Sequence, residues 1–544
     1  MYIFELDARS SHAIPSHVMH SARPRSLRLR VSTYQRVCNH VRCRHSARNL
    51  NAIISSVEPE DAPKFASIPS TAKGEGLRGK SIAVKDNITT LSPLRTTAAS
   101  KILEPHISPY EATVVALLRE HGAHITSKTN LDEFGMGSHS QHTHFDPVSS
   151  PFSRGGVVLS PGGSSGGSAV AVALGKAFAA LGTDTGGSVR LPAAYCGVVG
   201  FKPTYGRVSR WGVLQYAHSL DTVGVLARDV VNVDTVFEAI DRFDKNDPTS
   251  LSPSLRKRIS DQNAFQGGDR PGVDRPWRIG IPIDYNIQEL SPVAKDAYVE
   301  VLRKLQTAAG VGFSFHSVSL PSTRQALSAY YILAPVEASS NLAKYDGIRY
   351  GFRAPNEQDD DRAYRPEEKQ KKLPLYARTR GVGFGAEVQR RILLGTYSLS
   401  SDAKENFFVQ AQKIRRLVQM DFDAIFARPN PLHDGLREED YFTASAAKVD
   451  ILLTPTSPTL PPTVTEIERQ GSSVESYVND VFTVPASLAG LPALSVPVPL
   501  SNKMVEHMDP SDVRTISMQV IGQFGDDGNV LKFGKLLENM QMGL

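Results

Sequence analysis

Two glycine-rich stretches that also carry hydroxyl side chains are the strongest chemical signal in the sequence. The first is Pro-Gly-Gly-Ser-Ser-Gly-Gly-Ser over residues 161–168, and the second is Gly-Thr-Asp-Thr-Gly-Gly-Ser-Val-Arg over residues 182–190. Glycines let backbone N–H groups approach a reacting group closely, because no side chain blocks the way. We therefore expect these stretches to surround an atom that becomes negatively charged.

Other known motifs account less well for these stretches. A phosphate-binding P-loop would need a glycine in place of Val170 and a hydroxyl residue in place of Ala177. A nucleophile elbow over residues 163–167 would make Ser165 the nucleophile, but glycine-rich loops match that short pattern easily. Asp184 begins an Asp-Thr-Gly run like that of aspartic proteases, yet the sequence has no second run to supply the partner carboxylate. A purely structural glycine turn beneath a helix is the remaining alternative.

The elements that must position these residues alternate between short β-rich segments and helical patterns. This alternation predicts an α/β protein built on a mixed sheet. Residues 168–182 form a weakly polar run, too short to span a bilayer, that predicts a tightly packed buried helix. The expected strands lie at residues 81–84 and 451–453, and the expected helices at 113–120, 385–394 and 404–421.

The first 48 residues differ in composition from the rest of the chain. Residues 8–57 contain nine arginines and no acidic residue, which is typical of a mitochondrial transit peptide. Residues 49–544 are expected to form the catalytic domain. Polar segments near 244–276, 353–380 and 501–515 are expected to be its surface insertions. Outside the leader, acidic and basic residues nearly balance, so composition gives no support for a nucleic-acid-binding surface.

The cysteines and histidines predict neither disulfides nor a metal site. Two of the three cysteines lie in the leader, and Cys196 is expected to be a buried apolar residue. The cluster of His139, His142 and His144 lacks the spacing of a zinc site. We expect these histidines to be solvated loop residues.

Together with Ile-Ala-Val-Lys-Asp-Asn-Ile over residues 82–88, the two glycine-rich stretches resemble the amidase signature family. The resemblance implies an α/β fold whose mixed central sheet is covered by helices on both faces. It also implies that Ser188 is the nucleophile and that Ser164, after a cis peptide bond, relays protons to Lys85. A lysine can act as a base for a serine only where desolvation or neighbouring charge lowers its pKa. The apolar residues before Lys85 are consistent with such burial.

The same resemblance implies an oxyanion hole in the second stretch. The backbone N–H groups of Thr185, Gly186, Gly187 and Ser188 would bind the oxyanion formed when Ser188 attacks an amide. Losing one such donor typically costs about 2.7–4 kcal/mol of transition-state stabilisation.

Three further runs resemble one branch of the family, the A subunits of glutamyl-tRNA(Gln) amidotransferases. They cover residues 194–210, 337–350 and 387–396. In that branch the substrate is glutamine, and matching the motifs assigns its α-carboxylate to Arg391 and its α-ammonium to Asp480. Tyr330 and Ser138 are further candidates for the pocket wall. The alternative for Arg391 and Asp480 is a role in structural or surface ion pairs.

For this branch, the resemblance implies a glutaminase that forms an acyl-enzyme on Ser188. Its ammonia would pass to a partner that uses ATP and Mg to convert Glu-tRNA(Gln) to Gln-tRNA(Gln) in mitochondrial translation. The expected partners are a B subunit together with a small third subunit, with no cofactor, metal or membrane for this chain. One alternative is a stand-alone amidase acting on fatty-acid, aryl or small aliphatic amides. Another is a catalytically silent scaffold, which would not need the three intact residues.

Overall fold

The computed structural model describes residues 50–57, 76–264, 271–308, 312–354, 376–433, 448–470 and 478–541. The leader expected over residues 1–48 lies outside the described residues, as do the central part of 353–380 and a short part of 244–276. Of the expected insertions, 244–276 contains α7 (Pro253–Ala264), and 501–515 contains α15 (Asn502–Val505).

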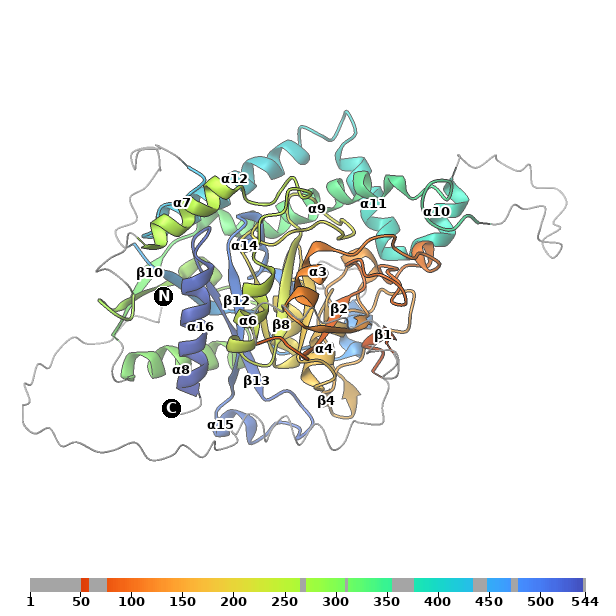
Figure 1. Cartoon of the computed structure of the whole chain (residues 1–544). Helices are drawn as coiled ribbons and strands as arrows, with labels where there is room; N and C mark the ends of the chain where they lie inside the picture. Colours follow the sequence, from red (N-terminus) through yellow and green to blue (C-terminus); the bar gives the residue numbers. More distant parts are fainter. Residues whose placement is uncertain are drawn as a thin grey trace, which may run out of the picture.

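An 11-stranded mixed sheet runs through the described structure (Figure 1). Parallel pairing joins β2 to β3 and β6, and β9 to β10 and β11, whereas the other neighbours pair antiparallel. A separate hairpin consists of β4 (Ser153–Arg154) and β5 (Val157–Val158). In spatial order the strands of the large sheet are β1 (Ile53–Ser56), β3 (His124–Thr129), β2 (Ser81–Lys85), β6 (Ala179–Asp184), β8 (Thr222–Ala227), β7 (Val199–Lys202), β12 (Ala493–Pro499), β13 (Thr515–Ile521), β11 (Ile451–Pro455), β9 (Trp277–Pro282) and β10 (Phe313–Val318).

Side chains alternate between the two faces of this sheet, and the apolar cores on one face are separate from the core on the other. In β2, Ile82 and Val84 belong to one core and Ala83 to another, as the two-residue period of a strand requires. In β11, Ile451 belongs to the first core and Leu452 to a third, on the opposite face. The strands near the middle of the sheet are therefore buried on both faces.

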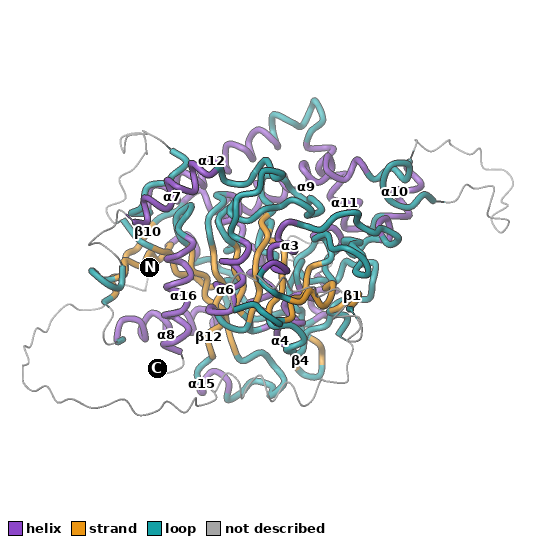
Figure 2. The backbone as a smooth tube through the Cα atoms, viewed as in Figure 1, coloured by secondary structure: helices purple, strands orange, loops and turns teal. Residues whose placement is uncertain are grey.

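Helices cover both faces (Figure 2), as the sequence resemblance implied. The core that contains Ile82 is closed by α3 (Thr113–Glu120), α6 (Val230–Ile240), α8 (Pro292–Thr307) and α16 (Asp527–Gln541). The opposite face is covered by α4 (Gly166–Ala173) and α5 (Arg190–Cys196), and further along by α9 (Ala326–Asn341), α11 (Ala386–Ser398), α12 (Phe408–Ile425) and α14 (Val484–Leu488). Shorter helices are α10 (Ala377–Gly383), α13 (Val464–Gln470), η1 (Lys101–Leu103), η2 (Glu133–Gly135), η3 (Ile283–Tyr285), η4 (Pro321–Gln325) and η5 (Leu342–Lys344).

One predicted element is wrong. The run 168–182 was expected to be a single buried helix, but α4 ends at Ala173 and the chain turns at Gly175, whose φ is +67°. Residues 179–184 then form β6, which is buried along its whole length. A continuous apolar run does not distinguish a buried helix from a strand covered on both faces, and this run contains one of each. The helix expected at 113–120 is α3 with the same bounds, whereas α12 begins and ends later than the pattern predicted.

Candidate active site

Lys85 is the last residue of β2, and its side chain is fully buried. It lies on the same side of the strand as Ala83, facing α4. Its ammonium nitrogen Nζ is 2.7 Å from Ser164 Oγ, 2.8 Å from Ser165 Oγ and 2.9 Å from Thr183 Oγ1. Lys85 is therefore held by hydroxyl groups from both glycine-rich stretches.

Burial lowers the pKa of Lys85 to about 7. The negative charges of Asp132, Asp184 and Asp221 oppose this shift, but desolvation is the larger effect. At neutral pH, a large fraction of Lys85 is consequently an uncharged amine that can accept a proton.

The first glycine-rich stretch packs closely against its neighbours. Its Gly163–Ser164 peptide bond is cis, and the Ser164 side chain is buried. A Cβ on Gly163 would lie 2.3 Å from Oδ2 of Asp132. The same carboxylate accepts hydrogen bonds from the N–H groups of Ser140, at 2.8 Å, and His142, at 3.0 Å. Asp132 thus holds the loop of residues 138–142 against a backbone that only glycine allows.

The second stretch connects β6 to α5 and carries Ser188. Asp184 at the end of β6 and Arg190 at the start of α5 form a fully buried ion pair, with Nη2 of Arg190 2.9 Å from Oδ1 of Asp184. The N–H of Val189 also donates to this carboxylate, at 3.2 Å. Although burial opposes it, the Arg190 guanidinium holds the pKa of Asp184 below its ordinary value. Both ends of the Ser188 loop are therefore fixed.

The backbone N–H groups of residues 185–188 are available to an anion. Among the hydrogen bonds between described residues, none has one of these four groups as its donor. The Ser188 side chain is 8% exposed, and its hydroxyl has no hydrogen-bond partner within the described part of the chain. The backbone of Ser188 accepts a hydrogen bond from the N–H of Ser165 at 3.1 Å, which joins the two stretches. Backbone donors without a protein acceptor are one requirement of an oxyanion hole.

Two side chains pack against the glycines of this loop. A Cβ on Gly186 would lie 2.6 Å from Cζ of Tyr330. Gly187 has a φ of +147°, and a Cβ there would lie 2.2 Å from Oγ1 of Thr483. The Thr483 hydroxyl donates to the carbonyl of Gly186 at 2.7 Å. Tyr330, predicted to line the pocket, therefore contacts the candidate oxyanion hole.

Arg391 on α11 is 4% exposed and is held by two side chains. Its Nε donates to Oε1 of Glu387 at 2.7 Å, and its Nη1 donates to the Tyr216 hydroxyl at 2.5 Å. The guanidinium also lies over the rings of Tyr216 and Tyr331, at 5.7 Å and 5.6 Å from their centroids. Although burial opposes it, Tyr216 and Glu387 raise the pKa of Arg391, so the group stays charged.

Asp480 supplies the opposite charge. The hydroxyls of Ser138 and Tyr331 donate to its Oδ2 at 2.7 Å and 3.1 Å. Burial raises the pKa of Asp480 to about 6, although these hydrogen bonds and Arg391 oppose the shift. The structure thus brings Ser138, Tyr330, Arg391 and Asp480 into one polar cluster beside the Ser188 loop.

Sequence reasoning missed several residues of this cluster. Glu387 stands four positions before Arg391, so a helical i, i+4 ion pair could have been expected. Tyr216 is 175 positions from Arg391, and no local pattern signals their contact. The other unpredicted contacts are made by Thr183, Asp221, Tyr331 and Thr483.

His139 corrects the expectation for the histidine cluster. His142 and His144 are exposed, but His139 is buried and its Nδ1 is 2.8 Å from Oγ of Ser160. Burial lowers its pKa to about 4, so it is neutral at physiological pH. Cys196 is buried as predicted.

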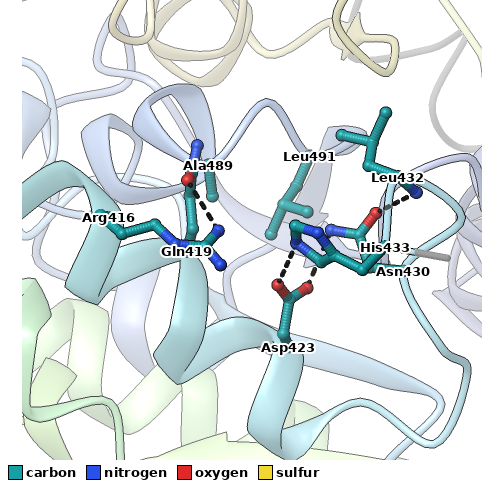
Figure 3. A pocket seen from close by; sticks show the side chains of 8 residues that line it. All are labelled: Arg416, Gln419, Asp423, Asn430, Leu432, His433, Ala489 and Leu491. Atoms are coloured by element: carbon teal, nitrogen blue, oxygen red, sulfur yellow. Dashed lines mark hydrogen bonds and ion pairs between the residues drawn. The ribbon is translucent and has the colours of Figure 1, made fainter. Parts of the chain in front are cut away.

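One cavity lies beside this cluster, and a second lies apart from it. The first is lined by Glu133, His142, Phe384 and Glu387 among others, and Glu387 also holds Arg391. The second (Figure 3) lies where Asp423 faces His433, 3.3 Å away, and contains none of the predicted site residues. No group of three acidic, histidine or cysteine side chains in the described ranges could hold a metal ion. Within the same ranges, no helix has the length and apolar character needed to cross a membrane.

Comparison with known proteins agrees with this geometry. The family model described as Amidase matches residues 39–531. A Coccidioides posadasii protein, named as the mitochondrial A subunit of glutamyl-tRNA(Gln) amidotransferase, is 51% identical, over 90% of this chain and 93% of that protein. Its namesake from Emericella nidulans is 53% identical, over 85% and 89%. A solved structure of the A subunit of glutamyl-tRNA(Gln) amidotransferase from Thermotoga maritima is 31% identical with a TM-score of 0.63, and the match covers 92% of this chain and 90% of that one.

Proposed function

The chain belongs to the amidase family, and from this premise we propose that it is the glutaminase subunit of a mitochondrial glutamyl-tRNA(Gln) amidotransferase. The observation that carries the proposal is the pair of buried charges, Arg391 and Asp480, beside the Ser188 loop. A free amino acid has a carboxylate and an ammonium that need such partners, and burying either one unpaired would be costly. An apolar amide would gain nothing from these charges, which argues against the stand-alone alternative.

The proposed reaction begins when Ser188 Oγ attacks the side-chain amide carbon of glutamine. Its proton moves through Ser164 to the neutral amine of Lys85, whose Nζ is 2.7 Å from Ser164 Oγ. The resulting oxyanion is bound by the N–H groups of residues 185–188. When the C–N bond breaks, the proton returns through Ser164 to the leaving ammonia, and a γ-glutamyl ester remains on Ser188.

Water then completes the cycle. It attacks the ester carbonyl while Lys85 accepts its proton through Ser164, and the proton then passes to Ser188 Oγ as the ester bond breaks. The products are glutamate and the regenerated enzyme. In this proposal the chain needs no cofactor of its own. A B subunit and a small third subunit complete the complex. The partner subunit uses ATP and Mg to amidate Glu-tRNA(Gln) with the released ammonia.

The test is ammonia release from glutamine by the chain co-expressed with candidate B and small subunits. We expect release that is stimulated by ATP and Glu-tRNA(Gln) and abolished by Ser188→Ala. Ser254→Ala, which changes an exposed serine in α7, should behave as wild type. Turnover of simple amides without any glutamine turnover would instead support a stand-alone amidase.

A further inference from the structure

The hydroxyl of Tyr216 connects the carboxylate-binding arginine to the oxyanion loop. Tyr216 is buried, and its hydroxyl accepts a hydrogen bond from Nη1 of Arg391 at 2.5 Å. The Tyr330 side chain lies close enough for the two phenol groups to interact electrostatically. Tyr330 in turn packs on Gly186, as the clash of a Cβ there with Cζ at 2.6 Å indicates. A continuous chain of contacts therefore runs from Arg391 to the Ser188 loop.

The backbone of the same segment makes a second connection. One carboxylate oxygen of Asp221 accepts the N–H groups of Tyr216, at 2.9 Å, and Ala217, at 3.0 Å. Its other oxygen accepts the hydroxyl of Thr185 at 2.7 Å. Asp221 is itself buried, so this bridge has little freedom to move. Tyr216 is thus fixed to the Ser188 loop through both its backbone and its side chain.

The guanidinium of Arg391 is constrained on two of its three nitrogens. Glu387 occupies Nε and Tyr216 occupies Nη1, and no hydrogen bond between described residues uses Nη2. Both N–H groups of Nη2 and the second N–H of Nη1 are thus left for a substrate carboxylate. The guanidinium also contacts the ring of Tyr216. These contacts fix the position of the guanidinium relative to Ser188, so the long side chain of Arg391 is not free to move.

We propose that Tyr216 is a positioning residue that sets the chain length of the α-carboxylated amide accepted by this site. The proposal rests on the glutaminase function proposed above. An amide bound by its carboxylate reaches Ser188 only if its carbon chain matches the fixed separation between Arg391 and the oxyanion loop. Asparagine is one methylene shorter than glutamine, and a misplacement of roughly 1 Å can lower a rate about 100-fold. Discrimination between the two amides should therefore depend on the Tyr216 hydroxyl.

The test compares kcat/KM for glutamine and asparagine in the assembled complex, for wild type and Tyr216→Phe. Because Arg391 gains freedom to approach Ser188, we expect the glutamine-to-asparagine ratio to fall about tenfold or more. Glu387→Gln, which weakens the contact at Nε, should lower the ratio in the same direction and tests the idea even if Tyr216→Phe does not fold. Tyr298→Phe is the matched control, because it loses a hydrogen bond of 2.7 Å to the carbonyl of Leu453, in the other core.

The outcomes separate this proposal from the function on which it rests. Wild-type glutamine turnover with an unchanged ratio in both Tyr216→Phe and Glu387→Gln would overturn the positioning role alone. An equal fall for the two amides would also overturn it, because that result indicates general damage to the site. Absence of glutamine turnover in the wild-type complex would overturn the proposed function and this inference together.

Discussion

The titration of Lys85 gives the sharpest test of the mechanism. Its pKa is lowered from 10.5 to about 7 by burial, and only the neutral amine can accept the proton of Ser188. With this pKa, about nine tenths of Lys85 is neutral at pH 8 and about one tenth at pH 6. We therefore expect kcat/KM for glutamine to fall about tenfold between pH 8 and pH 6 and to level off above 8. The profile of kcat/KM reports groups of the free enzyme, and protonation of Asp480 adds a further fall below pH 6.

The same shift predicts a change in stability that needs no substrate. Between pH 7 and 10.5 the unfolded chain binds a proton on Lys85 that the folded protein largely lacks, so wild-type stability rises with pH in that window. Lys85→Met removes this titration. Relative to Lys85→Met, wild type should gain about 2 kcal/mol of unfolding free energy between pH 7 and pH 9. Losses common to both pH values, such as the hydrogen bonds of Lys85, cancel in this comparison.

The assay is urea unfolding of both proteins at the two pH values, together with the kinetic pH profile. Lys85→Met should be inactive at every pH. Two results together would refute the reasoning. They are a kinetic pKa near 10 and a difference in unfolding free energy between wild type and Lys85→Met that stays constant from pH 7 to 9. That result would mean that Lys85 is solvated or charge-stabilised and carries a proton at neutral pH.

Three further predictions concern the substrate contacts and the loop. Arg391→Ala should raise KM for glutamine about 100-fold while sparing amides that have no carboxylate; equal losses for both would contradict the assignment. In the wild type, protonation of Asp480 removes its charge and should raise KM below pH 6. Asp480→Asn should raise KM about tenfold and abolish this dependence on pH. If KM of the variant still rises below pH 6, another group is responsible. Gly187→Ala should lower kcat at least about 100-fold, because the new Cβ would clash with Thr483 and shift the loop. Gly381→Ala is the control, because a Cβ at that position contacts no other atom. Full activity of Gly187→Ala would disprove the tight packing of this loop.

Local patterns predicted the burial of Lys85 and the close packing of the glycine-rich stretches, whereas the roles of Lys85, Ser164 and Ser188 came from the family resemblance. Lys85 follows three apolar residues of β2, and the glycines around Ser164 and Ser188 signal a backbone approached closely by other groups. Both signals are visible because they depend on neighbours in the chain. The run 168–182 failed for the opposite reason, since its division into α4 and β6 depends on what packs against each half.

Contacts between distant segments could not be predicted in this way. Thr483 lies 297 positions from Gly186, and its hydrogen bond to that glycine forms because the N-terminus of α14 lies against the Ser188 loop. Asp221 likewise accepts hydrogen bonds from both Tyr216 and Thr185, and no periodic pattern in the sequence indicates these contacts. The family resemblance assigned roles to Arg391, Asp480 and Ser138. It did not predict that Tyr216 and Glu387 hold Arg391 in place.

The strand order has a consequence for how this protein becomes active during its synthesis. β12 and β13, from the last tenth of the chain, pair with β7 and β11 in the interior of the sheet rather than at its edge. Until these two strands are added, β7 and β11 each have one edge without a partner strand. Arg190 also lacks the hydrogen bond of 2.6 Å that its Nη1 donates to Oε1 of Gln519. An incomplete chain therefore contains Lys85, Ser164 and Ser188 but lacks one of the hydrogen bonds that hold Arg190 at the end of the nucleophile loop. We therefore expect the site to reach its final geometry only after these last strands have joined the sheet.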